Sequence, residues 1–113
     1  MPPESAKLLF DAISAARAAQ EFVATRTQED YLADLMLRSA VERQLYILGE
    51  ALSQLRQIDP TKFDQIPDAR RIVAFRNVLA HGYAQIDDAR VWSIVETDLP
   101  AALSELETML PDG

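Results

Sequence analysis

The chain has 113 residues and a formal net charge of −7, and 49% of its residues are hydrophobic. This length and composition suit one globular domain, which we assign to residues 1–113 with an ordered core over about residues 5–110. The absence of cysteine excludes disulfides and cysteine-ligated zinc, and a single histidine cannot supply a multi-histidine metal site. Because there is neither a signal-peptide pattern nor a run of about 18 apolar residues, we expect a cytoplasmic protein without membrane span, metal or cofactor.

The negative charge argues against a protein that coats nucleic acid, because binders of phosphate backbones are usually basic. The charge is unevenly distributed, however. Between residues 67 and 83 the chain carries three arginines and one aspartate, a local charge of +2. The arginines of this cationic strip are Arg70, Arg71 and Arg76. The strip suits a site that handles one or two phosphates.

Apolar residues recur at helical spacing through most of the chain, and no stretch alternates as a strand would. The first predicted helix covers about residues 5–24. Thr27 followed by Asp30 is an N-cap signal for a second start, and the helical pattern then continues to about residue 57. This second segment carries an apolar stripe of Leu37, Val41, Leu45, Leu48, Leu52 and Leu55. It forms either one helix or two helices with a joint near Met36.

Two prolines place the segment "IDPTKFDQIPDA", residues 58–69, in a loop with room for a short turn. A helix should restart near Pro67–Ala69 and end at the break Gly82–Ile86. Its buried face should consist of Ile72, Phe75, Val78 and Leu79. A last helix begins near Asp87, and Pro100 should kink it because proline lacks an N–H and clashes with the preceding turn. The predicted fold is all-α, an antiparallel bundle of four to five helices.

The stretch "RNVLAHGY", residues 76–83, contains the only histidine of the chain. On a helix, Asn77 and His81 share a face opposite the apolar stripe, so His81 should not lie in the core. Arg76 lies about 140° around the helix from His81, so the two side chains would not touch in a continuous helix. They converge more easily if the helix ends at Gly82 or if a second chain contributes. In the alternative interpretation, His81 simply favours the negative end of the helix dipole and Arg76 is a solvated charge.

A second stretch, "AVERQLYILGEAL" at residues 40–52, has a polar side away from its leucines. This side is formed by Ser39, Arg43, Tyr46 and Glu50, with Glu42 and Gly49 beside it. Glycine inside a helix costs about 1 kcal/mol relative to alanine, so Gly49 suggests that another backbone comes close. The alternative is a solvated face with a network of salt bridges.

Together the two stretches resemble the HepT-like branch of the HEPN superfamily, whose members are small all-helical domains. The main motif of this branch is Arg-x4–6-His, often with a polar residue after the arginine and extended to His-x-Tyr. The matching residues here are Arg76, Asn77, His81 and Tyr83. A Glu-Arg followed by Gly-Glu-Ala on the preceding helix also matches, at Glu42, Arg43, Gly49, Glu50 and Ala51.

The resemblance implies a HEPN-like bundle that acts as a metal-independent endoribonuclease, the toxin of a toxin–antitoxin pair. His81 would move the 2′-hydroxyl proton of RNA, and Arg76 would hold the phosphate as charge builds. Asn77 would orient His81 or hold a phosphate oxygen, with Glu42, Arg43 and Glu50 in support. Because each chain has one histidine, two motifs facing each other in a homodimer would supply both acid and base.

The resemblance also implies a partner, a minimal nucleotidyltransferase that acts as the antitoxin. Such a partner transfers AMP from ATP to the tyrosine of His-x-Tyr, here Tyr83. The added phosphate and base would occupy the cations meant for RNA and block its entry. The alternative from another class is a non-catalytic helical dimer that binds the nucleotidyltransferase.

Overall fold

A computed structural model describes residues 3–81 and 86–110 of the chain. Within these ranges every element is helical and no strand is present, which confirms the predicted all-α bundle. The elements are α1 (Pro3–Val23), α2 (Gln28–Ala33), α3 (Leu35–Ile58), α4 (Pro60–Asp64), α5 (Ala69–His81), α6 (Asp88–Ser93), a π-helical turn (Ile94–Asp98) and α7 (Leu99–Met109). None of these helices has the length and hydropathy needed to span a lipid bilayer.

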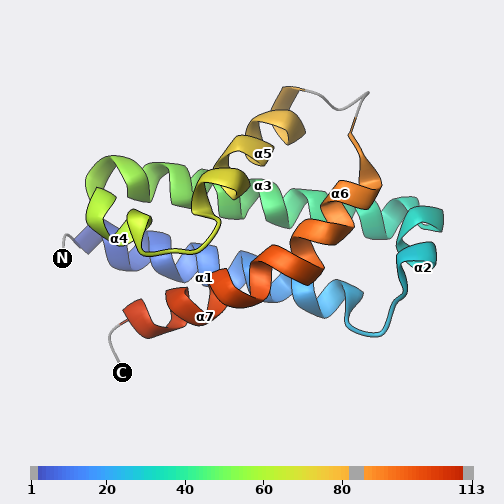
Figure 1. Ribbon diagram of the computed structural model, residues 1–113, viewed down its shortest axis with the longest axis horizontal. Helices are drawn as coiled ribbons and strands as arrows, with labels where there is room; N and C mark the ends of the chain where they lie inside the picture. Colours follow the sequence, from blue (N-terminus) through green and yellow to red (C-terminus); the bar gives the residue numbers. More distant parts are fainter. Residues whose placement is uncertain (1–2, 82–85, 111–113) are drawn as a thin grey trace.

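Figure 1 shows α1 and α3 running antiparallel side by side along the length of the molecule. α5 packs on α3, whereas α7 packs on α1, so the two long helices form the centre of the bundle. The core side of α1 is rich in small residues, with Ala12, Ala15, Ala16 and Ala19 all buried. Small side chains allow a close approach of the helix axes. All six residues of the predicted stripe on α3 are buried against this surface.

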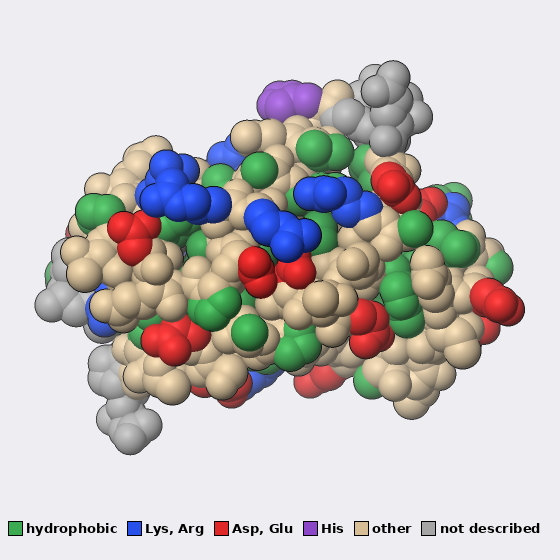
Figure 2. Space-filling model, in the orientation of Figure 1, with side chains coloured by type: hydrophobic (Ala, Val, Ile, Leu, Met, Phe, Trp, Pro, Cys, Tyr) green, Lys and Arg blue, Asp and Glu red, His purple; other side chains and the backbone are tan. Residues whose placement is uncertain are grey.

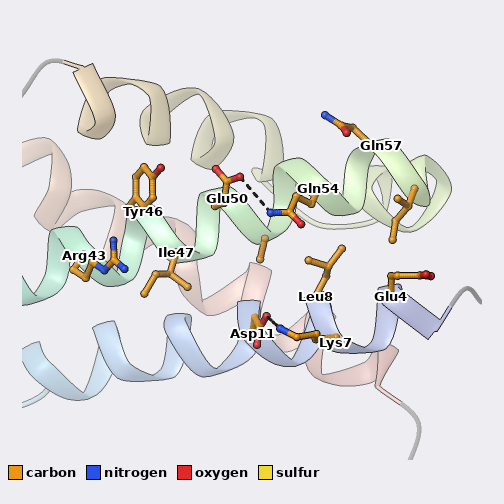
Figure 3. Close-up of a pocket in the computed structure, with 12 residues that line it drawn as sticks. Glu4, Lys7, Leu8, Asp11, Arg43, Tyr46, Ile47, Glu50, Gln54 and Gln57 are labelled. Atoms are coloured by element: carbon orange, nitrogen blue, oxygen red, sulfur yellow. Dashed lines mark hydrogen bonds and ion pairs between the residues drawn. The ribbon is translucent and has the colours of Figure 1, made fainter.

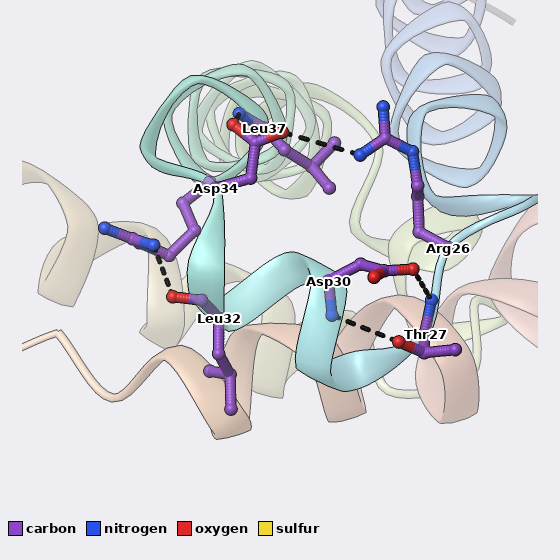
Figure 4. Close-up of polar contacts among 7 residues, drawn as sticks. Arg26, Thr27, Asp30, Leu32, Asp34 and Leu37 are labelled. Atoms are coloured by element: carbon purple, nitrogen blue, oxygen red, sulfur yellow. Dashed lines mark hydrogen bonds and ion pairs between the residues drawn. The ribbon is translucent and has the colours of Figure 1, made fainter.

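The joint between α2 and α3 decides between the two alternatives for residues 27–57 (Figure 4). Thr27 and Asp30 form the predicted cap, in which each side chain accepts a hydrogen bond from the other residue's backbone N–H. α2 ends at Ala33, and Asp34 adopts an extended backbone conformation. The Asp34 carboxylate then caps α3 by accepting a 3.1 Å hydrogen bond from the Leu37 N–H. The segment therefore forms two helices with the joint at Asp34.

The predicted loop at residues 58–69 contains the short helix α4, which places Phe63 in the core. α5 begins at Ala69, directly after Asp68, whose φ of 60° lies in the left-handed region. Pro67 is therefore outside the helix, although we expected it in the first turn. Ile72 and Phe75 are buried as predicted, whereas Leu79 is only partly buried. Val78 is 40% exposed, because α5 projects beyond the elements that cover its first half.

At the place where we predicted a kink, the helix accommodates Pro100 with the π-helical turn that directly precedes α7. In this turn the Leu99 N–H bonds to the carbonyl of Ile94, five residues earlier. The wider turn moves the preceding carbonyls away from the proline ring, and Pro100 itself lies in the first turn of α7, where no N–H is required. Residues 88–109 thus form one uninterrupted helical segment in Figure 1, although its direction changes between α6 and α7.

Candidate functional site

The two motif stretches meet where α5 packs on α3, and Gly49 is the point of closest approach. A Cβ atom placed on Gly49 would overlap Arg76 Cβ and would lie 3.0 Å from Arg76 Cγ and 3.4 Å from the carbonyl oxygen of Ile72. The prediction that another backbone comes close to Gly49 is confirmed. This backbone is α5 of the same chain, so the glycine does not argue for a contact between two copies.

Arg76 is held in place by residues of both helices. Its Nη2 lies 2.8 Å from Glu50 Oε2, and its Nη1 donates a 2.6 Å hydrogen bond to Asn77 Oδ1. The second carboxylate oxygen of Glu50 accepts a 3.3 Å hydrogen bond from Gln54 on the next turn of α3. The Arg76 side chain is only 22% exposed, and its Nε is buried without a hydrogen-bond partner. Arg76 is therefore an anchored cation rather than a solvated charge.

His81 lies at the other end of the motif, exposed at the last residue of α5. Helix α5 is continuous from Arg76 to His81, so the two side chains leave it about 140° apart. No hydrogen bond joins them, and Asn77, which we expected beside His81, contacts Arg76 instead. The helix of one chain does not bring the candidate acid–base group onto the anchored cation. Gly82 and Tyr83, the predicted helix end and modification site, lie outside the described residues.

The polar side of α3 faces the end of α5 across a groove of ≈ 450 Å³, which we call the α3–α5 groove. It is lined by Ser39, Glu42, Arg43, Tyr46, Leu79 and Ala80. The Arg43 guanidinium carbon lies 5.9 Å from the centroid of the Tyr46 ring. Figure 3 shows Tyr46 and Glu50 rising from α3 toward α5, whereas Ile47 points toward α1. Glu42 and Arg43 are thus near the histidine end of the motif, and Glu50 is at its arginine end.

On the other side of the same ridge a second groove, of ≈ 580 Å³, runs between α1 and α3 (Figure 3). Arg43 and Tyr46 border both grooves. The second groove contains more carboxylates than cations: Glu4, Asp11 and Glu50 against Lys7 and Arg43. An anionic ligand is therefore disfavoured there.

Glu42 connects the α3–α5 groove to a partly buried polar cluster that the sequence did not reveal. Burial and the nearby Asp88 carboxylate raise the pKa of Glu42, and Arg38 opposes them. Arg38 is engaged by Asp88 at 3.5 Å and donates a 2.6 Å hydrogen bond to the Leu32 carbonyl. Beneath them, burial first and then the charge of Glu42 raise the pKa of Tyr31. The spacing of Arg38 and Glu42 by four residues was the only available sequence signal, since it places both on one helix face.

The predicted cationic strip is largely neutralised by carboxylates from other parts of the chain. Arg70 pairs with Asp64 at 3.1 Å, and Arg71 lies 3.6 Å from the buried carboxylate of Asp98. Arg76 pairs with Glu50, as described above. In Figure 2, Lys and Arg side chains gather on the face that carries α5, with acidic side chains beside several of them. The +2 expected from the sequence is therefore not a free positive surface.

The molecule is an all-helical bundle in which α5 carries an anchored arginine and an exposed histidine. This helix packs on α3 at Gly49 and Glu50. The chain belongs to the ribonuclease HepT-like family, whose model matches residues 12–109. A relative from Methanocaldococcus jannaschii, "Putative RNase MJ1380", is 33% identical over 99 residues, which cover 88% of this chain and 90% of the relative. "Probable ribonuclease HepT" from Thermococcus cleftensis is 30% identical over 101 residues, which cover 89% and 91%. No solved structure matches the chain significantly. The family membership supports a ribonuclease-type function.

Proposed function

We propose that this protein is a metal-independent endoribonuclease, the toxin of a toxin–antitoxin pair. The observation that carries the proposal is the state of Arg76, a guanidinium that Glu50 and Asn77 hold in a fixed orientation on the same helix as the exposed His81. A purely structural bundle has no need to anchor a cation five residues before an exposed histidine in this way. Membership of the ribonuclease HepT-like family supports the same reading.

In the proposed reaction, His81 accepts the proton of a ribose 2′-hydroxyl, and the 2′-oxygen attacks the adjacent phosphorus. The bond from phosphorus to the 5′-oxygen breaks, and an imidazolium donates the proton that this oxygen needs. Guanidinium has five N–H donors, of which Glu50 and Asn77 use one on each Nη. The remaining N–H on each Nη can hold the two phosphate oxygens on which negative charge increases.

This reaction needs one neutral and one protonated imidazole, and each chain has a single histidine. We therefore propose a homodimer in which two copies place their residues 76–81 on opposite sides of one cleft. His81 of one copy and Arg76 of the other could then act on the same phosphate, which the continuous helix α5 does not allow within one chain.

The test is cleavage of mixed RNA by the purified protein in EDTA. His81→Ala should abolish cleavage and Arg76→Ala should nearly abolish it, because acid–base groups contribute roughly 10²–10⁴-fold to rate. Arg70→Ala is the matched control, since it also removes the arginine of an ion pair on α5 but lies outside the motif. Equal cleavage by all four proteins would indicate a contaminating nuclease and favour a non-catalytic module that binds a nucleotidyltransferase.

We further propose that a minimal nucleotidyltransferase is the antitoxin and silences the enzyme by AMP transfer to Tyr83. The phenol oxygen would attack the α-phosphate of ATP and release pyrophosphate. Co-expression with this partner should add AMP-sized increments to the intact mass and abolish cleavage. Tyr83→Phe should remain an active nuclease without the increment. The same increment on Tyr83→Phe would place the modification elsewhere.

A further inference from the structure

The α3–α5 groove lies directly beside the candidate histidine, because Ala80, which lines it, precedes His81 in the chain. It is a shallow groove, open to solvent, with a volume of ≈ 450 Å³. Neither the acid–base reaction nor the anchoring of Arg76 uses this groove. In the proposed dimer, a substrate whose phosphate lies between His81 of this copy and the arginine of the second copy's motif would extend an adjacent nucleotide toward this groove.

The chemistry of the groove suits a base rather than a phosphate. One carboxylate and one guanidinium, from Glu42 and Arg43, leave it without net charge. The Tyr46 ring with the Arg43 guanidinium above it provides a stacking surface, and Leu79 provides an aliphatic surface across the groove. Proteins recognise unpaired RNA bases by stacking on aromatic rings and guanidinium planes and by hydrogen bonds to the base edges.

Glu42 gives the groove its selectivity. Its carboxyl group is partly buried, and Arg38 on the same helix face is already engaged by Asp88 and the Leu32 carbonyl. The carboxylate oxygens of Glu42 can therefore accept hydrogen bonds from a ligand. Guanine offers two adjacent donors on its Watson–Crick edge, N1–H and the N2 amino group, which match the two oxygens of one carboxylate. Uracil offers a single N–H donor between two carbonyl groups, and the carbonyl oxygens repel a carboxylate.

We propose that the α3–α5 groove is a base subsite for an unpaired guanosine next to the scissile phosphate of single-stranded RNA, an inference that rests on the ribonuclease function proposed above. Tyr46 and Arg43 stack on the base, Glu42 accepts from its Watson–Crick edge, and Ser39 borders the entrance. The consequence is cleavage of unpaired RNA beside guanosine.

Binding is measured first, by fluorescence anisotropy with fully 2′-O-methylated oligonucleotides, which lack the attacking hydroxyl and are not cleaved. The probes are octauridine and the same octamer with one central guanosine or adenosine. The guanosine probe should bind most tightly. Tyr46→Ala should weaken its binding by roughly tenfold or more, as loss of one stacked base does. Glu42→Gln should abolish the preference for guanosine without weakening the binding of octauridine.

Arg56→Ala is the matched control for Arg43→Ala. Both arginines lie on α3 over an aromatic ring, Arg56 over Phe63 at 5.4 Å, but only Arg43 borders the groove. Arg43→Ala should reduce guanosine binding and Arg56→Ala should not. Tyr46→Ala removes a half-buried ring and could therefore also affect folding. Ser39 is exposed, so Ser39→Trp provides a second variant that fills the groove and leaves the core intact.

Cleavage assays separate this inference from the proposed function. If RNA is cleaved but the Tyr46 and Glu42 variants keep the wild-type KM and base preference, the subsite is refuted and the nuclease stands. If the guanosine probe binds with the expected variant pattern but no RNA is cleaved, the subsite stands and the nuclease is refuted. Equal binding of all three probes, or loss of binding in Arg56→Ala as large as in Arg43→Ala, would overturn the subsite.

Discussion

Gly49→Ala tests whether the close approach of α3 and α5 exists to fix Arg76. The added methyl group would overlap Arg76 Cβ and lie 3.0 Å from Arg76 Cγ and 3.4 Å from the Ile72 carbonyl oxygen. The backbone fixes the positions of Arg76 Cβ and the Ile72 oxygen, so a side-chain rotation cannot relieve these contacts. α5 must therefore move away from α3. The pair between Arg76 and Glu50, now 2.8 Å, would lengthen or change its geometry.

The expected effect on stability is modest, because two terms oppose each other. Overpacking costs typically about 1–3 kcal/mol, whereas replacing an internal glycine by alanine gains about 1 kcal/mol of helix propensity. A net loss of roughly 0–2 kcal/mol corresponds to a decrease in Tm of up to about 10 °C for a domain of this size. The effect on cleavage should be larger, since a displacement of about 1 Å in a positioning group can cost roughly 100-fold in rate.

The assay compares thermal unfolding, followed by circular dichroism, with kcat/KM for RNA cleavage. Ser53→Ala is the control, because it lies on the same helix, raises helix propensity and borders neither groove. Gly49→Ala should lose kcat/KM far beyond what its Tm explains, and Ser53→Ala should lose neither. A Gly49→Ala protein that is more stable than the wild type and cleaves equally well would refute the reasoning.

Three further outcomes are expected. Since the pKa of Glu42 is raised, its ionised form destabilises the fold, so Glu42→Gln should have a higher Tm than the wild type near neutral pH, and the gain should vanish below the ordinary value of 4.5. Asp34→Ala should lower Tm, because it removes the hydrogen bond that caps α3. Because the Leu37 N–H and Arg26 lower the pKa of Asp34, that decrease should shrink in melts recorded below the ordinary value of 3.8. Sedimentation at micromolar concentration should give about twice 12.6 kDa, and a monomer would exclude the composite site.

Features determined by neighbouring residues were predictable from the sequence. The cap at Thr27 and Asp30 involves residues three apart, and the stripe on α3 follows from helical spacing. Gly49 also gave a correct signal, because a glycine inside an apolar helix has a cost that needs a packing reason.

Features that depend on distant residues were not predictable. The cationic strip lost its charge to Asp64, Glu50 and Asp98, which approach it only after folding. The sequence leaves open whether the helix is interrupted near Met36, because the apolar spacing continues through this region. The cap hydrogen bond from the Leu37 N–H to Asp34 shows where the backbone turns. Val78 has the spacing of a core residue but is 40% exposed, because the described residues cover the second half of α5 only in part.

The π-helical turn determines which face of the last helical segment, residues 88–109, is buried. Its buried residues include Val91, Val95, Leu99 and Leu103, a strict repeat of four. In a regular α-helix such a repeat drifts around the axis by about 40° per step, so the apolar stripe would rotate away from α2 and α1, against which its two ends pack. The wide turn absorbs the excess as one inserted residue and returns the stripe to the same face.

The inserted residue and the proline therefore depend on each other: the wide turn makes room for the ring of Pro100. Deleting the exposed Thr97 would restore a regular helix, but the ring of Pro100 would then meet the carbonyl four residues before it. The deletion should be destabilising alone and tolerated together with Pro100→Ala. Pro100 thus disfavours a regular α-helix through residues 94–100 and so maintains the π-helical turn.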